Sequence, residues 1–586
     1  MYKAPVSEIG FTLRQVIGLD DAMGRGKLGD LTPDLLDAIL EEAGRYAGDA
    51  VAPLYESGDR IGAQFDKGVV TMPPGWGKLY TDWCAAGWNA LTGPVEAGGQ
   101  GLPTALSAAV TEMWNGASMA FGIGPTLTIA AVEALHKHGS EALKAIYLEK
   151  LTSGEWTGTM QLTEPQSGSD LSGLRTRAER RDDGTYRLFG QKIFITFGEH
   201  DMTDNIVHII LARLSDAPAG VKGISMFLVP KFIPDADGRP GLRNDAFCVG
   251  MEHKLGIHAS PTCTMVYGDN AGETGEAGAV AWLVGEENKG LACMFTMMNS
   301  ARLYVGVQGL GVAEAATQKA LAYAKDRRQG RARDGGEGMV PIIQHPDVRR
   351  MLMTMKALTA AARAICYSCA FAIDMSHAED GAEAARWADR ASVLTPMAKS
   401  FATDIGVEVA SMGIQVHGGM GFIEETGAAR LLRDARIAPI YEGTNGIQAM
   451  DLVMRKLPLG GGAALDALLA EIEADIDAVE TANRPGIAQM AEGLREALDD
   501  LRDATFFLRQ AGVDDALAGA TAYQRLFSLV LGGALMARAA LRADEGTGHG
   551  ALARFMVADI LPETRGLNRK VKATGRALES IEAALA

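Results

Sequence analysis

The strongest constraint on the fold of this chain is an island of strand-like sequence enclosed by helical sequence. Short runs rich in β-branched and aromatic residues, separated by turn signals, occupy 186–196, 205–214, 224–231, 262–268 and 279–284. Before about 157 and after about 288, apolar residues instead recur at helical spacing. No helix separates the strand runs, so we predict an antiparallel β domain of about 125 residues and exclude a Rossmann fold.

The helical sequence divides further. A Thr-Pro pair predicts a helix start at 32–48, and LPLGGG at 457–462 predicts a linker followed by about four helices, the last two near 520–543 and 551–583. The fold class is therefore mainly α with a central β domain. We predict five segments: an N-terminal extension (1–34), an N-terminal helical domain (35–157), the β domain (158–286), a helical bundle domain (287–456) and a C-terminal helical extension domain (464–586).

Charge and composition exclude several classes of protein. The formal net charge is −17, which argues against a nucleic-acid-binding protein, because such proteins normally carry a basic surface. The longest uncharged stretch, Met113 to Val132, contains three glycines and Pro125, so we expect no membrane span. The N-terminus lacks an export pattern, and six cysteines in 586 residues do not indicate a disulfide scaffold. We therefore expect a cytoplasmic protein.

Three local patterns resemble functional motifs but are better explained structurally. Gly306, Gly309 and Gly311 follow no strand and lack dinucleotide-binding spacing, so they predict close helix packing. Cys366 and Cys369 lie in an apolar helical run with no second pair, which favours buried thiols over a redox or zinc site. The pair at 136–138 has no further ligands nearby and most simply flanks a helix end, so no metal site is expected.

Three other segments carry candidate chemistry. The first, LTEPQSGSDLSG at 162–173, places hydroxyls around Gly168 and suits a cofactor loop, with a capped turn as the alternative. The second, at 415–434, contains a Gly-Gly-x-Gly turn that can cradle a pyrophosphate or simply form an interhelical loop. In the third, YEGT at 441–444, a carboxylate follows an apolar run. Such surroundings raise a carboxyl pKa and suit a general base, although a lone glutamate is more often a surface charge.

In this order and at these separations, the three segments strongly resemble the signatures of the acyl-CoA dehydrogenase family of flavoproteins. The first is similar to TEPxxGSD, with Gln161 replacing a small residue just upstream, and the third is similar to the YEGT motif that bears the catalytic base. The second resembles the other signature at its fixed positions: Gln415, Gly418, Gly419, Gly421, Phe422, Glu425, Arg430 and Asp434. The resemblance covers about 35–455 and implies the acyl-CoA dehydrogenase fold: an N-terminal helical domain, an antiparallel β-sandwich and a C-terminal four-helix bundle. The opening MYKAPV and the extra C-terminal helices are similar to a narrower bacterial subgroup.

The resemblance implies a reaction and its base. Glu442 would remove the α-proton of an acyl-CoA thioester, while the β-hydrogen leaves as hydride to flavin N5, giving a trans-2-enoyl-CoA. The thioester carbonyl would accept hydrogen bonds from the Glu442 backbone N–H and a flavin ribityl hydroxyl, which stabilise the developing enolate. An electron-transfer flavoprotein would accept the electrons. Two alternatives remain open: an acyl-CoA oxidase that uses oxygen, and a non-catalytic flavin-binding scaffold.

The resemblance also implies binding residues. The predicted FAD contacts are Leu162, Thr163, Gly168, Ser169, Phe194, Thr196, Arg327, Gln329, His345, Gln415, Gly418, Gly419 and Thr444. The predicted acyl-CoA contacts are Ser169, Asn299, Arg302 and Gly443. Phe194 stands where many members have tryptophan, and Gln329-Gly330 replaces a common Thr-Phe pair.

The shared site and the extra helices predict an assembly. Arg327 and Gln329 would reach the FAD of a neighbouring subunit, so a homo-oligomer is implied. The helices of 464–586 each carry an apolar stripe that needs burial. We expect them to cover their own chain's bundle where a second dimer would otherwise dock, which predicts a homodimer. The alternative is a mobile appendage on the glycine-rich linker.

Overall fold

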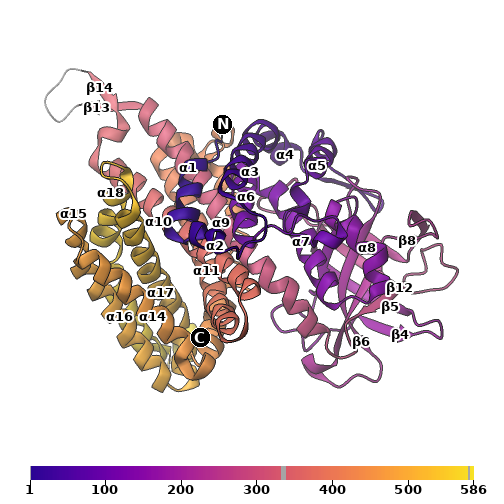
Figure 1. Ribbon diagram of the computed structural model, residues 1–586. Coiled ribbons are helices and arrows are strands. Elements are labelled where there is room, and N and C mark those ends of the chain that lie inside the picture. Colours follow the sequence, from indigo (N-terminus) through magenta and orange to yellow (C-terminus); the bar gives the residue numbers. More distant parts are fainter. Residues whose placement is uncertain (1, 332–337, 579–580) are drawn as a thin grey trace. The chain divides into compact units, whose positions relative to one another are not determined.

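A computed structural model describes residues 2–331, 338–578 and 581–586, and its contacts divide the chain into two compact units. The first unit comprises 48–102 and 118–301, and the second comprises 2–47, 103–117 and 302–586. Figure 1 labels the helices and strands of both units. The N-terminal segment of the chain therefore contributes residues to both units.

The first unit contains the predicted β domain and several helices. Its helices are α4 (Tyr55–Ile61), α5 (Trp76–Ala85), α7 (Met119–His138) and α8 (Glu141–Ser153), and a small hairpin pairs β1 (Gln64–Asp66) with β2 (Val69–Thr71). Its main sheet has eight strands: β3 (Thr157–Gln161), β4 (Arg177–Arg180), β5 (Tyr186–Thr196), β6 (Ile206–Leu214), β7 (Ile224–Pro230), β10 (Ala246–Met251), β11 (Thr262–Tyr267) and β12 (Ala279–Val284). A separate hairpin pairs β8 (Phe232–Pro234) with β9 (Pro240–Arg243). All five predicted strand runs are confirmed as β5, β6, β7, β11 and β12.

The expectation of a wholly antiparallel sheet is wrong in two places. The strand order is β10-β11-β5-β12-β7-β6-β3, and β3 pairs with β6 in parallel register, Thr157 opposite Ile206. The strand β4 pairs with β5 antiparallel and with β6 in parallel. Both parallel pairings join strands that are far apart in sequence, where long connections allow either direction. Strand periodicity reports which face is buried and carries no information about direction.

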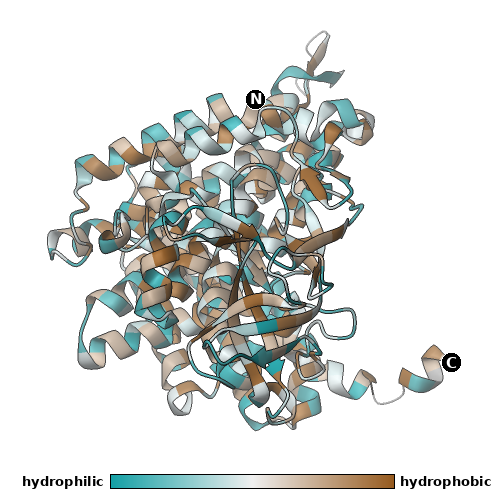
Figure 2. Ribbon diagram, turned by 90° about the vertical axis from the view of Figure 1, so that its right-hand side faces the viewer, coloured by the Kyte–Doolittle hydropathy of each residue, from teal (hydrophilic) through white to brown (hydrophobic). Residues whose placement is uncertain are grey.

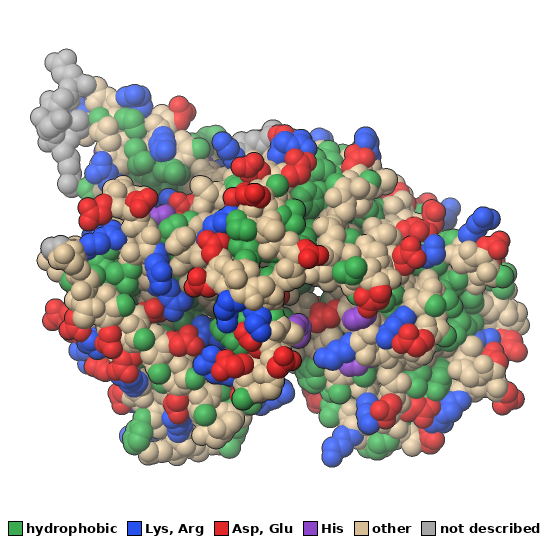
Figure 3. Space-filling model, viewed as in Figure 1, with side chains coloured by type: hydrophobic (Ala, Val, Ile, Leu, Met, Phe, Trp, Pro, Cys, Tyr) green, Lys and Arg blue, Asp and Glu red, His purple; other side chains and the backbone are tan. Residues whose placement is uncertain are grey.

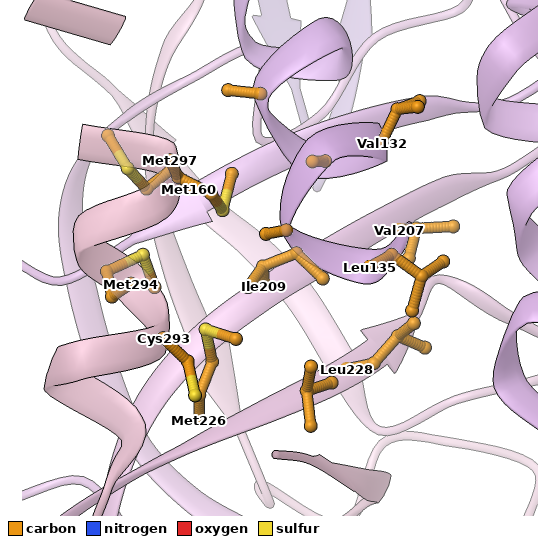
Figure 4. Close-up of a cluster of buried hydrophobic side chains, with 14 of the residues drawn as sticks. Val132, Leu135, Met160, Val207, Ile209, Met226, Leu228, Cys293, Met294 and Met297 are labelled. Carbon is orange, nitrogen blue, oxygen red and sulfur yellow. The ribbon is translucent and has the colours of Figure 1, made fainter. Parts of the chain in front are cut away.

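A core cluster that contains several methionines lies against β3, β6 and β7 in the first unit. Figure 4 shows Met226, Met294 and Met297 in one cluster with Ile209 and Leu228, and all five side chains are fully buried. The unbranched thioether of methionine adapts to irregular gaps between helices and strands. This packing fixes the end of β3, from which the predicted cofactor loop begins.

The second unit is helical. Its helices before the linker are α1 (Val6–Phe11), α2 (Leu19–Gly24), α3 (Pro33–Tyr46), α6 (Thr104–Ala117), α9 (Gly290–Asp326, which begins in the first unit), α10 (Pro346–Ala378), α11 (Gly381–His417), α12 (Ala428–Ala435) and α13 (Asn445–Asp451). A hairpin of β13 (Arg328–Arg331) and β14 (Met339–Pro341) follows α9. The predicted start at 32–48 is confirmed, because Thr32 caps α3 by accepting a hydrogen bond from Leu35 N.

Small residues and thiols have the structural roles that the sequence predicts. A Cβ on Gly306 or Gly309 would lie 2.5 or 2.4 Å from backbone carbonyl oxygens of α11, so these glycines permit close packing of α9 against α11. Cys366 and Cys369 are buried and form no disulfide, and His138 ends α7. Among the described residues, no group of three or more His, Cys, Asp or Glu side chains could hold a metal ion.

The C-terminal helices pack on the bundle of the same chain. They are α14 (Ala463–Glu480), α15 (Pro485–Ala488), α16 (Met490–Gln510), α17 (Val513–Arg542), α18 (Gly548–Phe555), α19 (Glu563–Leu578) and α20 (Ile581–Leu585). Within the second unit, α17 lies against α10 (Figure 1), and it also contacts α13. Gln524 Nε2 donates a hydrogen bond to Pro396 O of α11 at 3.0 Å. Docking on the bundle is thus confirmed, whereas the single helix expected at 551–583 is in fact divided.

The glycine-rich linker is a tight turn. Gly460, Gly461 and Gly462 all have positive φ, which favours glycine at these positions. Arg509 of α16 donates a hydrogen bond to Gly462 O at 3.3 Å, so the turn is held against the helices that follow it. This geometry does not support the alternative of a freely mobile appendage.

Two helices, α7 and α10, are long and apolar enough by length and composition to cross a membrane, but 83% and 89% of their most apolar windows are buried inside the protein. Hydrophobic colour runs along many helices and strands in Figure 2, while connecting loops are largely hydrophilic. On the face seen in Figure 3, acidic and basic side chains are interspersed. The expectation that no segment spans a membrane stays a prediction.

Candidate active site

The first candidate segment lies beside strand β5 in the first unit. Ile193 N donates a hydrogen bond to Thr163 O at 3.0 Å, which brings the loop after β3 next to the end of β5. Leu162, Thr163 and Thr196 are half-buried, whereas Gly168 and Ser169 are exposed. The first unit therefore contains six of the predicted FAD contacts, two on β5 and four on the segment after β3 that begins beside it.

Phe194 is the most unusual of these six residues. Its ring is 58% exposed, and its backbone has a φ of +60°, a conformation that side-chain-bearing residues rarely adopt. Strained backbone of this kind clusters at ligand sites, because the surrounding fold must enforce it. The fold thus holds the Phe194 ring in an accessible position, and the family resemblance predicts that this ring contacts the flavin.

A buried ion pair organises the same loop. Lys192 Nζ lies 2.9 Å from Glu164 Oε1 and also donates to Leu162 O at 3.0 Å. The Glu164 carboxylate accepts further hydrogen bonds from the Thr176 N–H at 3.0 Å and the Arg175 N–H at 2.7 Å. Burial alone would raise the pKa of Glu164, but the Lys192 charge and these hydrogen bonds outweigh it and lower the pKa to about 2. The glutamate of the TEP signature therefore holds the loop rather than contacting a ligand.

The YEGT segment forms a turn in the second unit. Asn445 N donates to Pro439 O at 3.0 Å, closing the backbone around Glu442, whose φ is +55°. Gly443 has a φ of +85°, and a Cβ there would lie 2.6 Å from Gln448 Nε2, so glycine is required. Thr444 Oγ1 accepts a hydrogen bond from Ile447 N and caps α13. The turn thus presents the Glu442 carboxyl from a strained and tightly closed backbone.

The Glu442 carboxyl lies among buried charges. Burial raises the pKa of Glu442 to about 7, while Arg302 and Lys399 act in the opposite direction. Arg302 is itself buried on α9, and the position of a Gly443 Cβ lies 3.6 Å from Arg302 Nη2. A carboxyl with a pKa near neutrality is suited to take up a proton at physiological pH.

Several polar atoms around the turn have no protein partner. Arg302 Nε, Gln308 Nε2 and Gln448 Oε1 are buried without hydrogen bonds. Within the part of the chain that the structure describes, no acceptor engages the Glu442 N–H either. Buried polar groups are normally hydrogen-bonded, so these atoms can still donate to or accept from a ligand. The Glu442 N–H is therefore available for a ligand carbonyl, as the resemblance expects.

The remaining predicted cofactor contacts in the second unit form a separate group. Arg327 is exposed directly before β13, and Gln329 is exposed within β13. His345 Nε2 lies 2.7 Å from Gln329 O. Gln415 is exposed in the last turn of α11, and the exposed Gly418 and Gly419 directly follow this helix. The His417 ring at its end stacks on Tyr323 of α9 at 4.4 Å. The structure thus joins these two sets at the C-terminal ends of α9 and α11.

This second group lies far from the Glu442 turn in the same chain. Arg302, which lies beside the Glu442 turn, is about a third of the way along α9, and Arg327 directly follows the end of this helix. The helix between them spans about 36 Å at about 1.5 Å per residue. That distance exceeds the length of an extended dinucleotide cofactor.

Asn299, a predicted acyl-CoA contact, is an exposed residue of α9 in the first unit.

Family models cover most of the chain. They are described as acyl-CoA dehydrogenase N-terminal domain (34–155), middle domain (159–270) and C-terminal domain (288–457), followed by an acetyl-CoA dehydrogenase C-terminal-like domain (468–582). The chain is 46% identical to a 3-methylmercaptopropionyl-CoA dehydrogenase of Ruegeria pomeroyi, over 95% of this chain and 94% of that protein.

The chain belongs to the acyl-CoA dehydrogenase family.

Other relatives agree. A butyryl-CoA dehydrogenase of Syntrophomonas wolfei is 34% identical over 92% of this chain and 91% of that protein. The solved butyryl-CoA dehydrogenase of Megasphaera elsdenii matches 74% of this chain and 99% of its own, with 29% identity and a TM-score of 0.59. A Bacillus anthracis acyl-CoA dehydrogenase structure shares the fold over 100% of this chain and 95% of its own, with a TM-score of 0.74 and 22% identity. This acyl-CoA dehydrogenase therefore has the family fold with additional C-terminal helices.

The acyl-CoA dehydrogenase family uses FAD, and the residues present fit that cofactor. The exposed Phe194 ring offers a flat surface for an isoalloxazine. Gly418 has a φ of +59° and ψ of −141°, a conformation essentially restricted to glycine, and open space surrounds it. An exposed backbone of this kind can approach a pyrophosphate closely. The protein is thus a flavin-dependent oxidoreductase, while the contacts of individual residues stay predictions.

Sequence reasoning missed several residues around the turn. Lys399 lies buried on α11 and donates to Asn445 Oδ1, and the Tyr441 hydroxyl donates to Gln308 Oε1. A signal for Lys399 existed, because it stands among Met397, Ala398, Phe401 and Ala402 in a helix whose apolar residues face the core. No motif marks Gln308, which contacts the turn only through the tertiary fold.

Proposed function

We propose that this acyl-CoA dehydrogenase acts on 3-methylmercaptopropionyl-CoA and produces methylthioacryloyl-CoA in dimethylsulfoniopropionate breakdown. The supporting observation is the 46% identity to the Ruegeria pomeroyi enzyme of that name, which extends over 95% of this chain and includes the C-terminal helices. The opening MYKAPV and the C-terminal extension resemble the same subgroup. A short- or medium-chain fatty acyl-CoA is the alternative substrate, supported by the 34% identity to a butyryl-CoA dehydrogenase.

In the proposed mechanism, Glu442 is the base. Its carboxylate takes the α-proton of the thioester, and a pKa near 7 lets it hold that proton once the C–H bond is broken. The Glu442 N–H donates a hydrogen bond to the thioester carbonyl and stabilises the charge that develops on oxygen. Arg302, buried beside Gly443, keeps this region electropositive. Bound FAD supplies the acceptor for the β-hydrogen and its electron pair.

The FAD site is proposed to draw on two copies of the chain. Arg302, which lies beside the Glu442 turn, and Arg327 are about 36 Å apart along α9, so one cofactor in contact with both groups must take them from different subunits. Large apolar side chains are exposed beside the glycine turn, with Phe422 84% accessible. The C-terminal helices cover the bundle of their own chain, which favours a homodimer over a larger assembly.

The proposed electron acceptor is an electron-transfer flavoprotein. Support comes from a 27% identical match, with a TM-score of 0.59, to a chain of a solved structure described as an electron transferring flavoprotein of Acidaminococcus fermentans. That match covers 72% of this chain and 98% of the other. An acyl-CoA oxidase remains the alternative because it shares the first half-reaction. Comparing turnover with oxygen against turnover with a ferricenium acceptor distinguishes the two.

We also propose a cytoplasmic location, supported by six cysteines that form no disulfide, since oxidising compartments favour disulfides.

The substrate is tested by following flavin bleaching in the holoenzyme with methylthio, short-chain and medium-chain acyl-CoAs. The proposal predicts the highest kcat/KM with 3-methylmercaptopropionyl-CoA. A higher kcat/KM with butyryl-CoA or octanoyl-CoA would contradict it, and absence of bleaching by every thioester would favour the non-catalytic scaffold.

A further inference from the structure

Lys399 is a buried cation that no motif of the chain explains. Its side chain is 0% exposed in the interior of α11. Burial lowers the pKa of Lys399 to about 7, because an ammonium group is poorly solvated inside a protein. Within the described residues, no carboxylate forms a direct ion pair with its Nζ. A fold that retains such a group uses either its charge or its hydrogen bond.

The hydrogen bond of Lys399 reaches the turn that carries Glu442. Lys399 Nζ donates to Asn445 Oδ1 at 2.8 Å, and Asn445 directly follows the YEGT segment. Asn445 Nδ2 in turn donates to Asp404 Oδ1 at 2.7 Å and to Thr403 Oγ1 at 3.0 Å. One side chain thus ties the end of the turn to successive positions of α11.

The charge of Lys399 also acts on Glu442. Arg302 and, after it, Lys399 lower the pKa of Glu442 against the effect of burial, while Asp404 and, after it, Glu442 raise the pKa of Lys399. The other charged groups close to this pair come from every element around it. They are Asp404 on α11, Arg302 on α9, Asp451 at the end of α13, Arg455 in the helical segment that follows α13, and Glu408 of α11 and Arg525 of α17, which both act on Asp404.

A hydrogen bond alone does not require a lysine. A glutamine has an N–H group that can donate to Asn445 Oδ1 and does not carry the desolvation penalty of a buried charge. The positive charge of a buried lysine is useful only where it stabilises a neighbouring group that must be ionised in an apolar environment. The Glu442 carboxylate is such a group. The structure therefore favours a role for the charge in addition to the hydrogen bond.

We propose that Lys399 is a positioning residue for the dehydrogenation. Its buried charge stabilises the Glu442 carboxylate, and its hydrogen bond to Asn445 holds the turn that presents this carboxylate. The inference rests on the proposed role of Glu442 as the base.

The test measures the rate of flavin bleaching by saturating acyl-CoA as a function of pH in the holoenzyme. Lys399→Gln removes the charge and keeps a donor, Lys399→Met removes both, and Asn445→Ala keeps the charge. Lys356→Met, at an exposed position of α10, changes the net charge equally and serves as the control. FAD content and thermal melting verify that each variant is folded.

Both Lys399 variants are expected to shift the acidic limb of the profile to higher pH by at least about half a unit, a factor of about three in rate on that limb. Asn445→Ala should lower the plateau without this shift, and Lys356→Met should match the wild type. The role of the charge would be overturned if a folded, FAD-loaded Lys399→Gln variant had its acidic limb at the same pH as the wild type. It would also be overturned if Asn445→Ala shifted the acidic limb as far as the Lys399 variants do. Failure of the proposed function looks different, because the wild-type holoenzyme itself would not bleach.

Discussion

Lys192 and Glu164 form an ion pair of 2.9 Å in which both side chains are buried. The same lysine donates to Leu162 O, and the same carboxylate accepts the backbone N–H groups of Arg175 and Thr176. The pair therefore connects β5 to both ends of the loop that carries the predicted flavin contacts. A signature glutamate next to a cofactor can thus act entirely by shaping the backbone.

Removing one member of this pair should be costly. Lys192→Met leaves the Glu164 charge buried and uncompensated, for which the expected loss in free energy of unfolding is about 3–5 kcal/mol, together with weaker FAD retention. Denaturant unfolding and the flavin-to-protein ratio measure both effects. The double variant with Glu164→Gln should recover part of the stability, and a single variant as stable as the wild type would contradict this account.

The same pair predicts a pH dependence of stability. The pKa of Glu164 is lowered to about 2 in the folded protein, so its contribution is present above the unfolded value of about 4.3 and is lost as the pH falls toward 2. Unfolding measured across this range should show a smaller loss of stability in Glu164→Gln than in the wild type. Parallel curves for the two proteins would show that the carboxylate is not stabilised.

Activity should depend on pH through Glu442. Burial raises the pKa of Glu442 to about 7, and only the ionised carboxylate can take the α-proton. The value of kcat/KM is therefore expected to rise as the pH passes through about 7 and to level off above it. A kcat/KM that stays constant between about pH 5 and 8 would contradict the perturbed carboxyl.

How far the sequence predicts this structure depends on the kind of information. The strands β5 and β12 have the predicted bounds, because β-branched runs between turn signals are a local pattern. The parallel pairing of β3 with β6 could not be predicted, since pairing direction depends on residues far apart in the chain. The same holds for Lys399, whose burial and contact with Asn445 arise only when α11 packs against the turn.

The shared cofactor site can be tested with Arg327. This exposed residue lies about 36 Å along α9 from Arg302, so the account assigns it to the cofactor of a partner subunit. Arg327→Ala should weaken FAD retention and dimer stability together, because one charge-assisted contact is lost from both. Light scattering and flavin content provide the measurements. A monomer with a full complement of FAD would be inconsistent with a shared site.

The docking of the C-terminal helices depends on Gly532. A Cβ at this position of α17 would lie 2.8 Å from the Ala361 Cβ of α10, so Gly532→Leu should separate the two helices and expose the 457–462 turn to proteolysis. Gly566→Leu places the same side chain on α19, where nothing lies within 4 Å, and is the matched control. Equal proteolytic resistance of the two variants would argue against docking through α17.

The central claim is that Glu442 removes the α-proton, and Glu442→Gln tests it most directly. The amide has nearly the same shape but cannot take up a proton, so the holoenzyme should keep FAD and still bind acyl-CoA. Its flavin bleaching by a saturating acyl-CoA should be slower by several orders of magnitude. A variant that retains more than about a tenth of the wild-type bleaching rate, equivalent to about 1.4 kcal/mol of barrier, would show that another group is the base.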